Sequence, residues 1–477
     1  MEENSNKAPK EQEPPKAPLS VYERSILLHG AIWFFLILFG YYILRPIRGQ
    51  ISSTYGSTTL FYLFVVTFVV MLVAIPLYSV LVGKYHRRKL VPGIYAVAIG
   101  CLFLFWLAMR MLPERVQVYV AGGLFVWISV FGLFVVSFFW SVVGDMLSTT
   151  QGRRVFGYIA GGGTLGSLAG SFVVSQLVHR IGVANLLIIP AILLTLALLV
   201  YISMERSFSK LATGPSQIRS GKATGGNPFA GFTAIVKSRY LFAISLFGLL
   251  LATCGTTVYF QQGEIVKATF ANVEFDETQI ENADQLNEEE LVAARQKLQI
   301  EASKEASANY FANVDIAVSI ATLIIQFFVV GWLMKNWGLG ISLAILPLAY
   351  VFGISALAIS PTIEVLVIVS VLGRSSEYGI CNPAREVLFT AIEREDRYKA
   401  KSFIDTVVRR GGDSAVGGAY NVLRDPSGLF GFAMTTLSWL MVPIALAWVG
   451  LAFFIGHENK LILARKAEQP NEKDNPT

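Results

Sequence analysis

The chain has 477 residues, of which 54% are hydrophobic and only 15% charged, with a formal net charge of +6. The apolar residues form blocks of about 20, which is typical of membrane-spanning helices and indicates a polytopic, all-α membrane protein. No nucleic-acid partner is needed to explain the positive charge, because an excess of Lys and Arg on cytoplasmic loops already follows from membrane insertion. The three cysteines lie in apolar segments, so no disulfide or metal framework is predicted.

The apolar blocks predict about twelve spans, arranged as two six-helix halves in a pseudo-symmetric bundle. The spans lie near residues 25–48, 58–83, 90–110, 117–145, 155–178, 182–203, 239–265, 309–334, 340–360, 363–392, 402–422 and 429–456. The chain divides into a polar tail (1–20), a first half (21–204), a linker (205–238), a second half (239–456) and a second tail (457–477). Within the second half, residues 268–308 form an acidic insert in which Asn287 to Glu290 predict a capped helix start.

Basic residues cluster in the loops on one side of the predicted spans, including Lys84, Arg87 and Arg88 after the second span. Because cytoplasmic loops carry an excess of Lys and Arg, this side is predicted to be cytoplasmic. An even number of spans then places both termini in the cytoplasm.

Span ten carries charged residues that a lipid-facing helix would not tolerate. A charge at the bilayer centre costs about 2.5–3.5 kcal/mol on insertion scales, so such residues persist when they are paired or face a wet cavity. At about 100° per residue, Arg374, Glu377 and Arg385 share one helix face. They predict either an internal ion-pair set that closes a gate or direct contacts to a charged substrate.

Span eleven repeats this arrangement. Asp405, Arg409 and Asp413 follow i, i+4, i+8 spacing on one stripe, and the same two interpretations stay open for them. Arg410 is expected to point about 100° away from Arg409, so that both cannot face one narrow cavity.

The first span presents Tyr41, Arg45 and Arg48 within about 60° of one another. Arginine forks match phosphate oxygens bidentately and a tyrosine ring can stack on a base, so this face could bind an anionic ring compound. The alternative is that both arginines extend to lipid headgroups from a helix end broken by Pro46.

Asp145 at the end of span four lies near Arg153 and Arg154 in the following loop. These residues predict an ion pair at an inner gate, with a solvated loop charge as the alternative.

The fifth span is rich in glycine between Gly161 and Gly170. Small residues at this spacing favour close helix packing. The stretch is not a phosphate-binding loop, because that motif needs a Lys followed by Ser or Thr after a soluble strand. No nucleophile, metal cluster or cofactor site with catalytic spacing is evident, so an enzyme is not predicted.

Three patches carry a resemblance to a known family. They are Leu44-Arg45-Pro46-Ile47-Arg48, the run from Phe139-Trp140 through Arg154 and Phe156, and Asn382-Pro383-Ala384-Arg385-Glu386 with residues 397–406 and 409–412. Together they resemble the ATP:ADP antiporter family, nucleotide transporters related to the major facilitator superfamily. The sequence departs from that family where Gly49 replaces an acidic residue and Arg48 replaces a lysine.

The resemblance implies a secondary-active transporter that moves an anionic organic solute by alternating access, with ATP/ADP-type nucleotide exchange as the leading function. It also implies a bacterial plasma membrane. Binding residues would be Tyr41, Arg45, Arg48, Arg374, Arg385 and Arg409, and gating residues Asp145, Arg153, Arg154, Glu377, Asp405 and Asp413. Two alternatives remain: transport of a non-nucleotide anion, lipid or peptide, and a non-transporting membrane scaffold or sensor. The sequence leaves the oligomeric state open.

Overall fold

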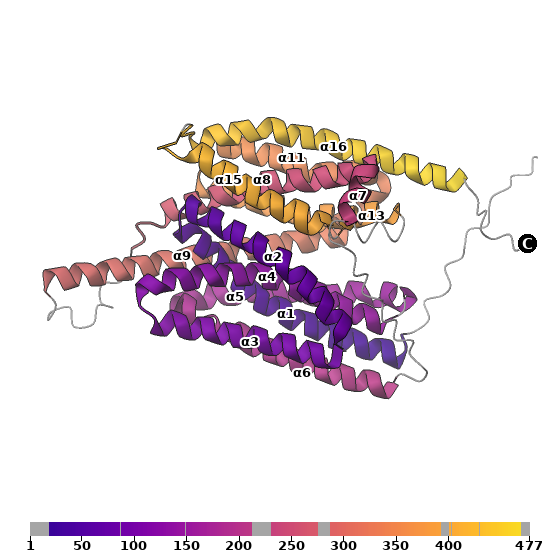
Figure 1. The fold of residues 1–477 in the computed structure, drawn as a ribbon, viewed down its shortest axis with the longest axis horizontal. Helices are drawn as coiled ribbons and strands as arrows, with labels where there is room; N and C mark the ends of the chain where they lie inside the picture. Colours follow the sequence, from indigo (N-terminus) through magenta and orange to yellow (C-terminus); the bar gives the residue numbers. More distant parts are fainter. Residues whose placement is uncertain are drawn as a thin grey trace, which may run out of the picture.

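The computed structural model describes residues 19–85, 87–147, 149–211, 230–274, 287–392, 400–401, 403–428 and 430–468. Within these ranges the chain is helical, and the long helices run roughly parallel in a bundle of two groups (Figure 1). The expected all-α polytopic bundle is confirmed. We call the first group, α1 to α6, the N-terminal half, and the second group, α8 to α16, the C-terminal half.

The N-terminal half contains six long helices. They are α1 (Val21–Thr54), α2 (Ser57–Lys84), α3 (Arg87–Met111), α4 (Glu114–Met146), α5 (Thr149–Asn185) and α6 (Ile188–Leu211). Its core surrounds Trp33, which is fully buried and donates a hydrogen bond of 2.7 Å to the Tyr95 hydroxyl. Helix α1 continues through Pro46 to Thr54, which contradicts the alternative of a helix end broken at this proline. Arg45 and Arg48 therefore lie inside a continuous helix.

As far as the structure is described, the C-terminal half has six further spans, and three of them contain a π-helical turn (η). The short helix α7 (Ala230–Lys237) precedes this half. The elements of the half are α8 (Arg239–Thr269), α9 (Glu288–Ile324), η3 (Ile325–Val329), α10 (Val330–Asn336), α11 (Gly338–Ile359), α12 (Ile363–Ser376), η4 (Glu377–Cys381), α13 (Asn382–Thr390), η5 (Ile404–Val408), α15 (Arg409–Arg424) and α16 (Met434–Glu468). Trp448 is fully buried at the centre of this half. The capped helix start is confirmed, since Asn287 and Glu290 form a reciprocal capping box.

Among the described residues, nine helices are long and apolar enough to cross a membrane. The three remaining spans are α5, the α12–η4–α13 segment and the η5–α15 segment. These are the glycine-rich span and the two spans with charged stripes, and α5 packs against α1 and α9 while α15 packs against α8 and α2. Protein contacts replace lipid along part of their surface, and their polar residues can be accommodated there.

Glycines bring α5 into backbone contact with α1. A Cβ atom at Gly162 would lie 2.5 Å from the Ala31 carbonyl oxygen, and one at Gly166 would collide with the carbonyl of Phe35. The close packing expected from the glycine-rich stretch is confirmed. This close packing holds α1, the helix that carries Arg45 and Arg48, against α5 of the N-terminal half.

Candidate functional site

A cavity of about 230 Å³ lies between the two halves. Its wall comes from α1 and α2 on one side and from α8, α9, α11, α12, η4 and α15 on the other. Its ionisable lining consists of Arg45, Arg48, Asp315, Arg374, Glu377, Arg409, Arg410 and Asp413. Five arginines against three carboxylates give these groups a formal charge of +2. The cavity can therefore hold an anion.

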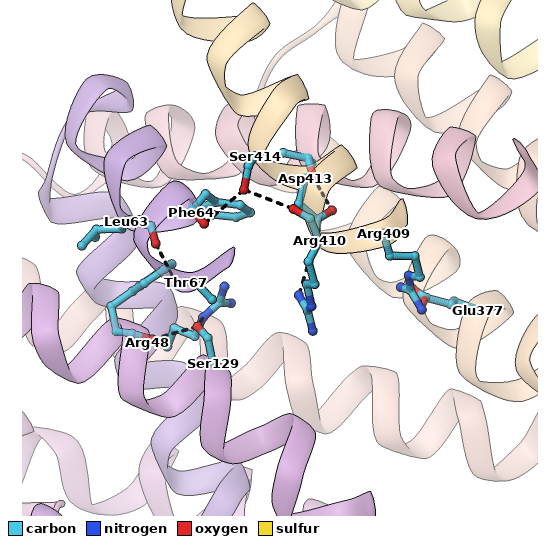
Figure 2. Close-up of polar contacts among 12 residues, drawn as sticks. Arg48, Leu63, Phe64, Thr67, Ser129, Glu377, Arg409, Arg410, Asp413 and Ser414 are labelled. Carbon is cyan, nitrogen blue, oxygen red and sulfur yellow. Dashed lines mark hydrogen bonds and ion pairs between the residues drawn. The ribbon is translucent and has the colours of Figure 1, made fainter. Parts of the chain in front are cut away.

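The three arginines from the C-terminal half are each paired with a carboxylate of the same half. Arg409 Nη2 lies 3.0 Å from Glu377 Oε1, and Arg410 Nη1 lies 3.3 Å from Asp413 Oδ2 (Figure 2). Arg374 pairs with Asp315. The C-terminal side of the cavity is therefore close to neutral.

The two arginines from α1 have no carboxylate of their own half, as far as the described residues show. Arg48 donates to the Ser129 hydroxyl at 2.7 Å, and its guanidinium carbon lies 4.3 Å from the centre of the Phe125 ring (Figure 2). Arg45 donates to the hydroxyls of Tyr42 at 3.1 Å and Tyr378 at 2.9 Å. The surplus charge of the cavity thus comes from α1.

The π-turns decide which charged residues of spans ten and eleven share the cavity. A π-turn closes an i→i+5 hydrogen bond and so shifts all later side chains around the helix. Glu377 is the first residue of η4, and beyond this turn Arg385 is buried and pairs with Asp405 at 2.9 Å. Neither of these two residues lines the cavity. The expectation that Arg374, Glu377 and Arg385 share one face is therefore wrong for Arg385.

Span eleven contains the η5 turn. Asp405 lies within it and turns to Arg385, whereas Arg409 and Asp413 follow it and line the cavity. Asp405, predicted as a gating or ion-pair residue, therefore pairs with span ten outside the cavity lining. Arg410 lines the cavity together with Arg409, which contradicts the expectation that both cannot face it.

Tyr41, predicted to bind the substrate, lies away from the cavity lining. The Tyr41 ring packs against α4 at Gly132, where there is no room for a Cβ atom. The neighbouring Tyr42 is the ring that contacts Arg45. The side chains of Asp145, Arg153 and Arg154 are outside the described part of the structure, so the predicted inner-gate pair stays a prediction.

Sequence reasoning missed Asp315 on α9. This residue is only 2% exposed, and its carboxylate lies between Arg374 and Arg45, with Oδ2 3.9 Å from Arg45 Nε. The signal was present, since Asp315 is a lone carboxylate in the apolar stretch that begins near residue 309.

The two halves contact each other at the end of the bundle where α1 ends and α2 begins. Thr58 donates to Asn421 at 3.2 Å. Ser414 donates to the Phe64 carbonyl oxygen at 3.1 Å (Figure 2). Gly49 belongs to the same contact, because a Cβ there would lie 2.6 Å from the Phe311 ring of α9. From this end, the ribbon of α2 diverges from the C-terminal half (Figure 1).

A family model described as Major Facilitator Superfamily matches residues 9–271, which are more than half of the chain. The chain belongs to the Major Facilitator Superfamily. The twelve spans of the described residues form two halves with a polar cavity between them, which is the arrangement of a membrane transporter of this superfamily. A search of curated proteins finds no match.

Solved structures of transporters share this fold at low sequence identity. A point mutant of the nucleoside transporter NupG aligns with a TM-score of 0.54 and 14% identity, covering 92% of this chain and 99% of its own. An auto-inhibited POT family peptide transporter aligns with a TM-score of 0.54 and 13% identity, and the alignment covers 95% of this chain and 99% of that transporter. A bacterial homologue of the iron transporter ferroportin, in an inward-facing state, aligns with a TM-score of 0.53 and 12% identity. The alignment covers 92% of this chain and 99% of that homologue. These similarities concern the fold alone.

Proposed function

We propose that this superfamily member carries an anionic, phosphate-bearing organic solute by alternating access, with nucleotides of the ATP/ADP type as the leading substrates and exchange as the mode. The observation that carries the proposal is the pair of α1 arginines, Arg45 and Arg48, which line the cavity without a carboxylate of their own half in the described structure. Guanidinium groups suit phosphate because their planar donors match two oxygens at once. The resemblance to the ATP:ADP antiporter family supports the same class.

Aromatic rings in the same cavity favour a substrate that also contains a ring. Phe64, Tyr259, Phe311 and Tyr350 line it together with the arginines. A base or sugar ring can pack against such side chains while the phosphate groups contact the guanidinium groups. One cavity thus combines the two kinds of contact that a nucleotide needs.

The size of the cavity bears on the mechanism. Sites for drug-sized ligands are usually about 300–1,000 Å³, and this cavity is about 230 Å³. A nucleotide would need more room, which becomes available if pairs such as Arg409–Glu377 and Arg410–Asp413 separate. Binding that replaces these pairs would favour a different arrangement of the halves, because a ligand shifts a conformational equilibrium by its differential affinity for the two states.

The direction of opening follows from the basic loops. If the side with Lys84, Arg87 and Arg88 is cytoplasmic, the contacts around Thr58 and Gly49 close the outer end. We therefore propose an inward-open state in a bacterial plasma membrane, with both termini in the cytoplasm.

A smaller, non-nucleotide anion is the second candidate substrate. The cavity volume of about 230 Å³ favours it, since a compact organic phosphate or dicarboxylate needs less rearrangement. The surplus of +2 would be balanced by one such dianion.

The test is uptake into liposomes that contain the purified protein. Labelled ATP is added outside, with ADP or buffer inside, and a small organic phosphate is measured in parallel. Nucleotide exchange predicts ATP uptake that needs internal ADP, that is lost in Arg45→Gln and that persists in Arg110→Gln, since Arg110 is an exposed residue of α3 outside the cavity lining. Uptake of the small phosphate without ATP uptake selects the second candidate. No anion transport by folded protein rejects both.

A further inference from the structure

The carboxylate of Asp315 occupies the place between the halves where an anionic substrate would meet Arg45. It belongs to α9 of the C-terminal half and lies within ion-pair distance of Arg45 of the N-terminal half. None of the other acidic residues of the cavity lining, Glu377 and Asp413, has a described ion pair across the halves. Asp315 is therefore the described cavity carboxylate that links the two halves.

The two contacts of Asp315 differ in strength. Its Oδ1 makes a close ion pair and hydrogen bond with Arg374 Nη2, a residue of its own half. Its Oδ2 is 3.9 Å from Arg45 Nε, which is too long for a hydrogen bond. A substrate oxygen could take over Arg45 while Asp315 stays with Arg374.

Two polar groups of the cavity lining have no hydrogen-bond partner among the described residues. Arg374 Nε and the Tyr259 hydroxyl are both buried, and neither has a hydrogen-bond partner in the described structure. Both residues line the cavity. A buried donor without a partner costs free energy, which an added anion with several acceptor oxygens can recover.

We propose that Asp315 is an internal competitor of the substrate: its carboxylate holds Arg45 in the empty carrier, and the anionic group of the substrate displaces it. This inference rests on the proposed function, because it needs an anion to bind Arg45. Displacement removes a contact between the halves and replaces it with contacts that the substrate makes to both of them. Asp315 thus sets how tightly the anion binds and ties binding to the separation of the halves.

The experiment measures anion binding through the thermal unfolding midpoint of detergent-purified protein, with ATP and inorganic phosphate as probes at constant ionic strength. Asp315→Asn is compared with wild type and with Asp413→Asn. Both variants remove one negative charge from the cavity lining, but only Asp315 reaches Arg45. We expect Asp315→Asn to lower the apparent dissociation constant about tenfold and Asp413→Asn to change it less than about threefold.

The possible results separate this inference from the proposed function. If wild type binds ATP and Asp315→Asn binds it no more tightly, the inference fails and the proposed function stands. If phosphate but not ATP binds, and binds more tightly in Asp315→Asn, the inference stands and the nucleotide assignment fails. An equal gain in anion affinity in Asp315→Asn and Asp413→Asn overturns the inference, because the change in net charge alone then explains the gain. Absence of binding in every folded variant overturns both.

A second variant covers the case in which Asp315→Asn does not fold. Tyr378 also holds Arg45 from the C-terminal half, through a hydrogen bond of 2.9 Å, and it does not line the cavity. Tyr378→Phe removes this bond with little change in shape. We expect it to tighten phosphate or ATP binding about twofold to threefold, and weaker or unchanged binding would contradict the displacement of Arg45 from its C-terminal partners.

Discussion

The two walls of the central cavity differ in how their arginines are balanced. On the N-terminal wall, Arg45 and Arg48 are held by hydroxyl groups and aromatic rings. On the C-terminal wall, Arg374, Arg409 and Arg410 are each paired with a carboxylate of their own half. An anion placed between the walls would gain most from the first set, because it need not compete there with a carboxylate from the same half.

The backbones of the two halves differ in a parallel way. Helix α1 is continuous and packs against the glycines of α5, whereas the C-terminal spans with charged residues contain the π-turns η3, η4 and η5. Such turns occur frequently at functional sites, since they re-aim side chains within a helix. We therefore expect the N-terminal wall to hold a fixed anion site and the C-terminal wall to carry ion pairs that can rearrange.

The largest expected effect is a loss of stability when an ion pair of the C-terminal wall is broken. Arg374→Ala leaves the Asp315 carboxylate, which is 2% exposed, without its closest partner. Removing one member of a buried ion pair typically costs about 3–5 kcal/mol, and we expect a loss of this size in stability. The measurement is the unfolding midpoint in detergent.

The matched control for that variant adds Asp315→Asn to Arg374→Ala. With no uncompensated charge left, much of the lost stability should return. A double variant as unstable as Arg374→Ala would mean that the arginine stabilises the bundle by packing rather than by pairing.

A smaller effect, of a different kind, is expected on the N-terminal wall. Arg48→Ala removes no carboxylate partner in the described structure, so its unfolding midpoint should stay near that of wild type. Anion binding should weaken by about 1.5–3 kcal/mol, the range for hydrogen bonds to charged groups. Titration of the purified protein with ATP or phosphate measures this loss.

Arg48→Lys sharpens the same test, since it keeps the charge and loses the planar fork. Binding that is recovered only in part indicates that donor geometry matters as well as charge. If Arg48→Ala lowers stability as much as Arg374→Ala, the proposed difference between the walls is wrong.

Much of the fold could be predicted from the sequence because each span is a separate apolar block. The charged stripes of spans ten and eleven were also found, since a charged residue in such a block stands out. The register of these stripes could not be predicted. A π-turn has no simple sequence signal, so periodicity at about 100° per residue places Arg385 on the face of Arg374 and Glu377. In the structure, Arg385 pairs with Asp405 and does not line the cavity.

Asp315 shows a second limit of the sequence. Its role depends on Arg45 and Arg374, which are 270 and 59 positions away in the chain and come together only when the halves pack. A single carboxylate in an apolar span indicates a functional position, but it does not identify its partners. Tertiary packing supplies that information.

The smallest expected effect concerns the rigid support of the N-terminal wall. Gly166→Ala would place a methyl group against the Phe35 carbonyl of α1, at a contact between two backbones. Overpacking of this kind typically costs about 1–3 kcal/mol, and we expect a lower unfolding midpoint. The control is Gly161→Ala in the same helix, where a Cβ atom has nothing within 4 Å and alanine should be neutral or slightly stabilising. Because α1 carries Arg45 and Arg48, Gly166→Ala should also weaken phosphate or ATP binding, whereas Gly161→Ala should leave it unchanged. A Gly166→Ala protein that loses stability but binds the anion as tightly as wild type would show that the arginines keep their positions without close packing between α1 and α5. The fixed character of the N-terminal wall would then have to come from the contacts of Arg48 with Ser129 and Phe125.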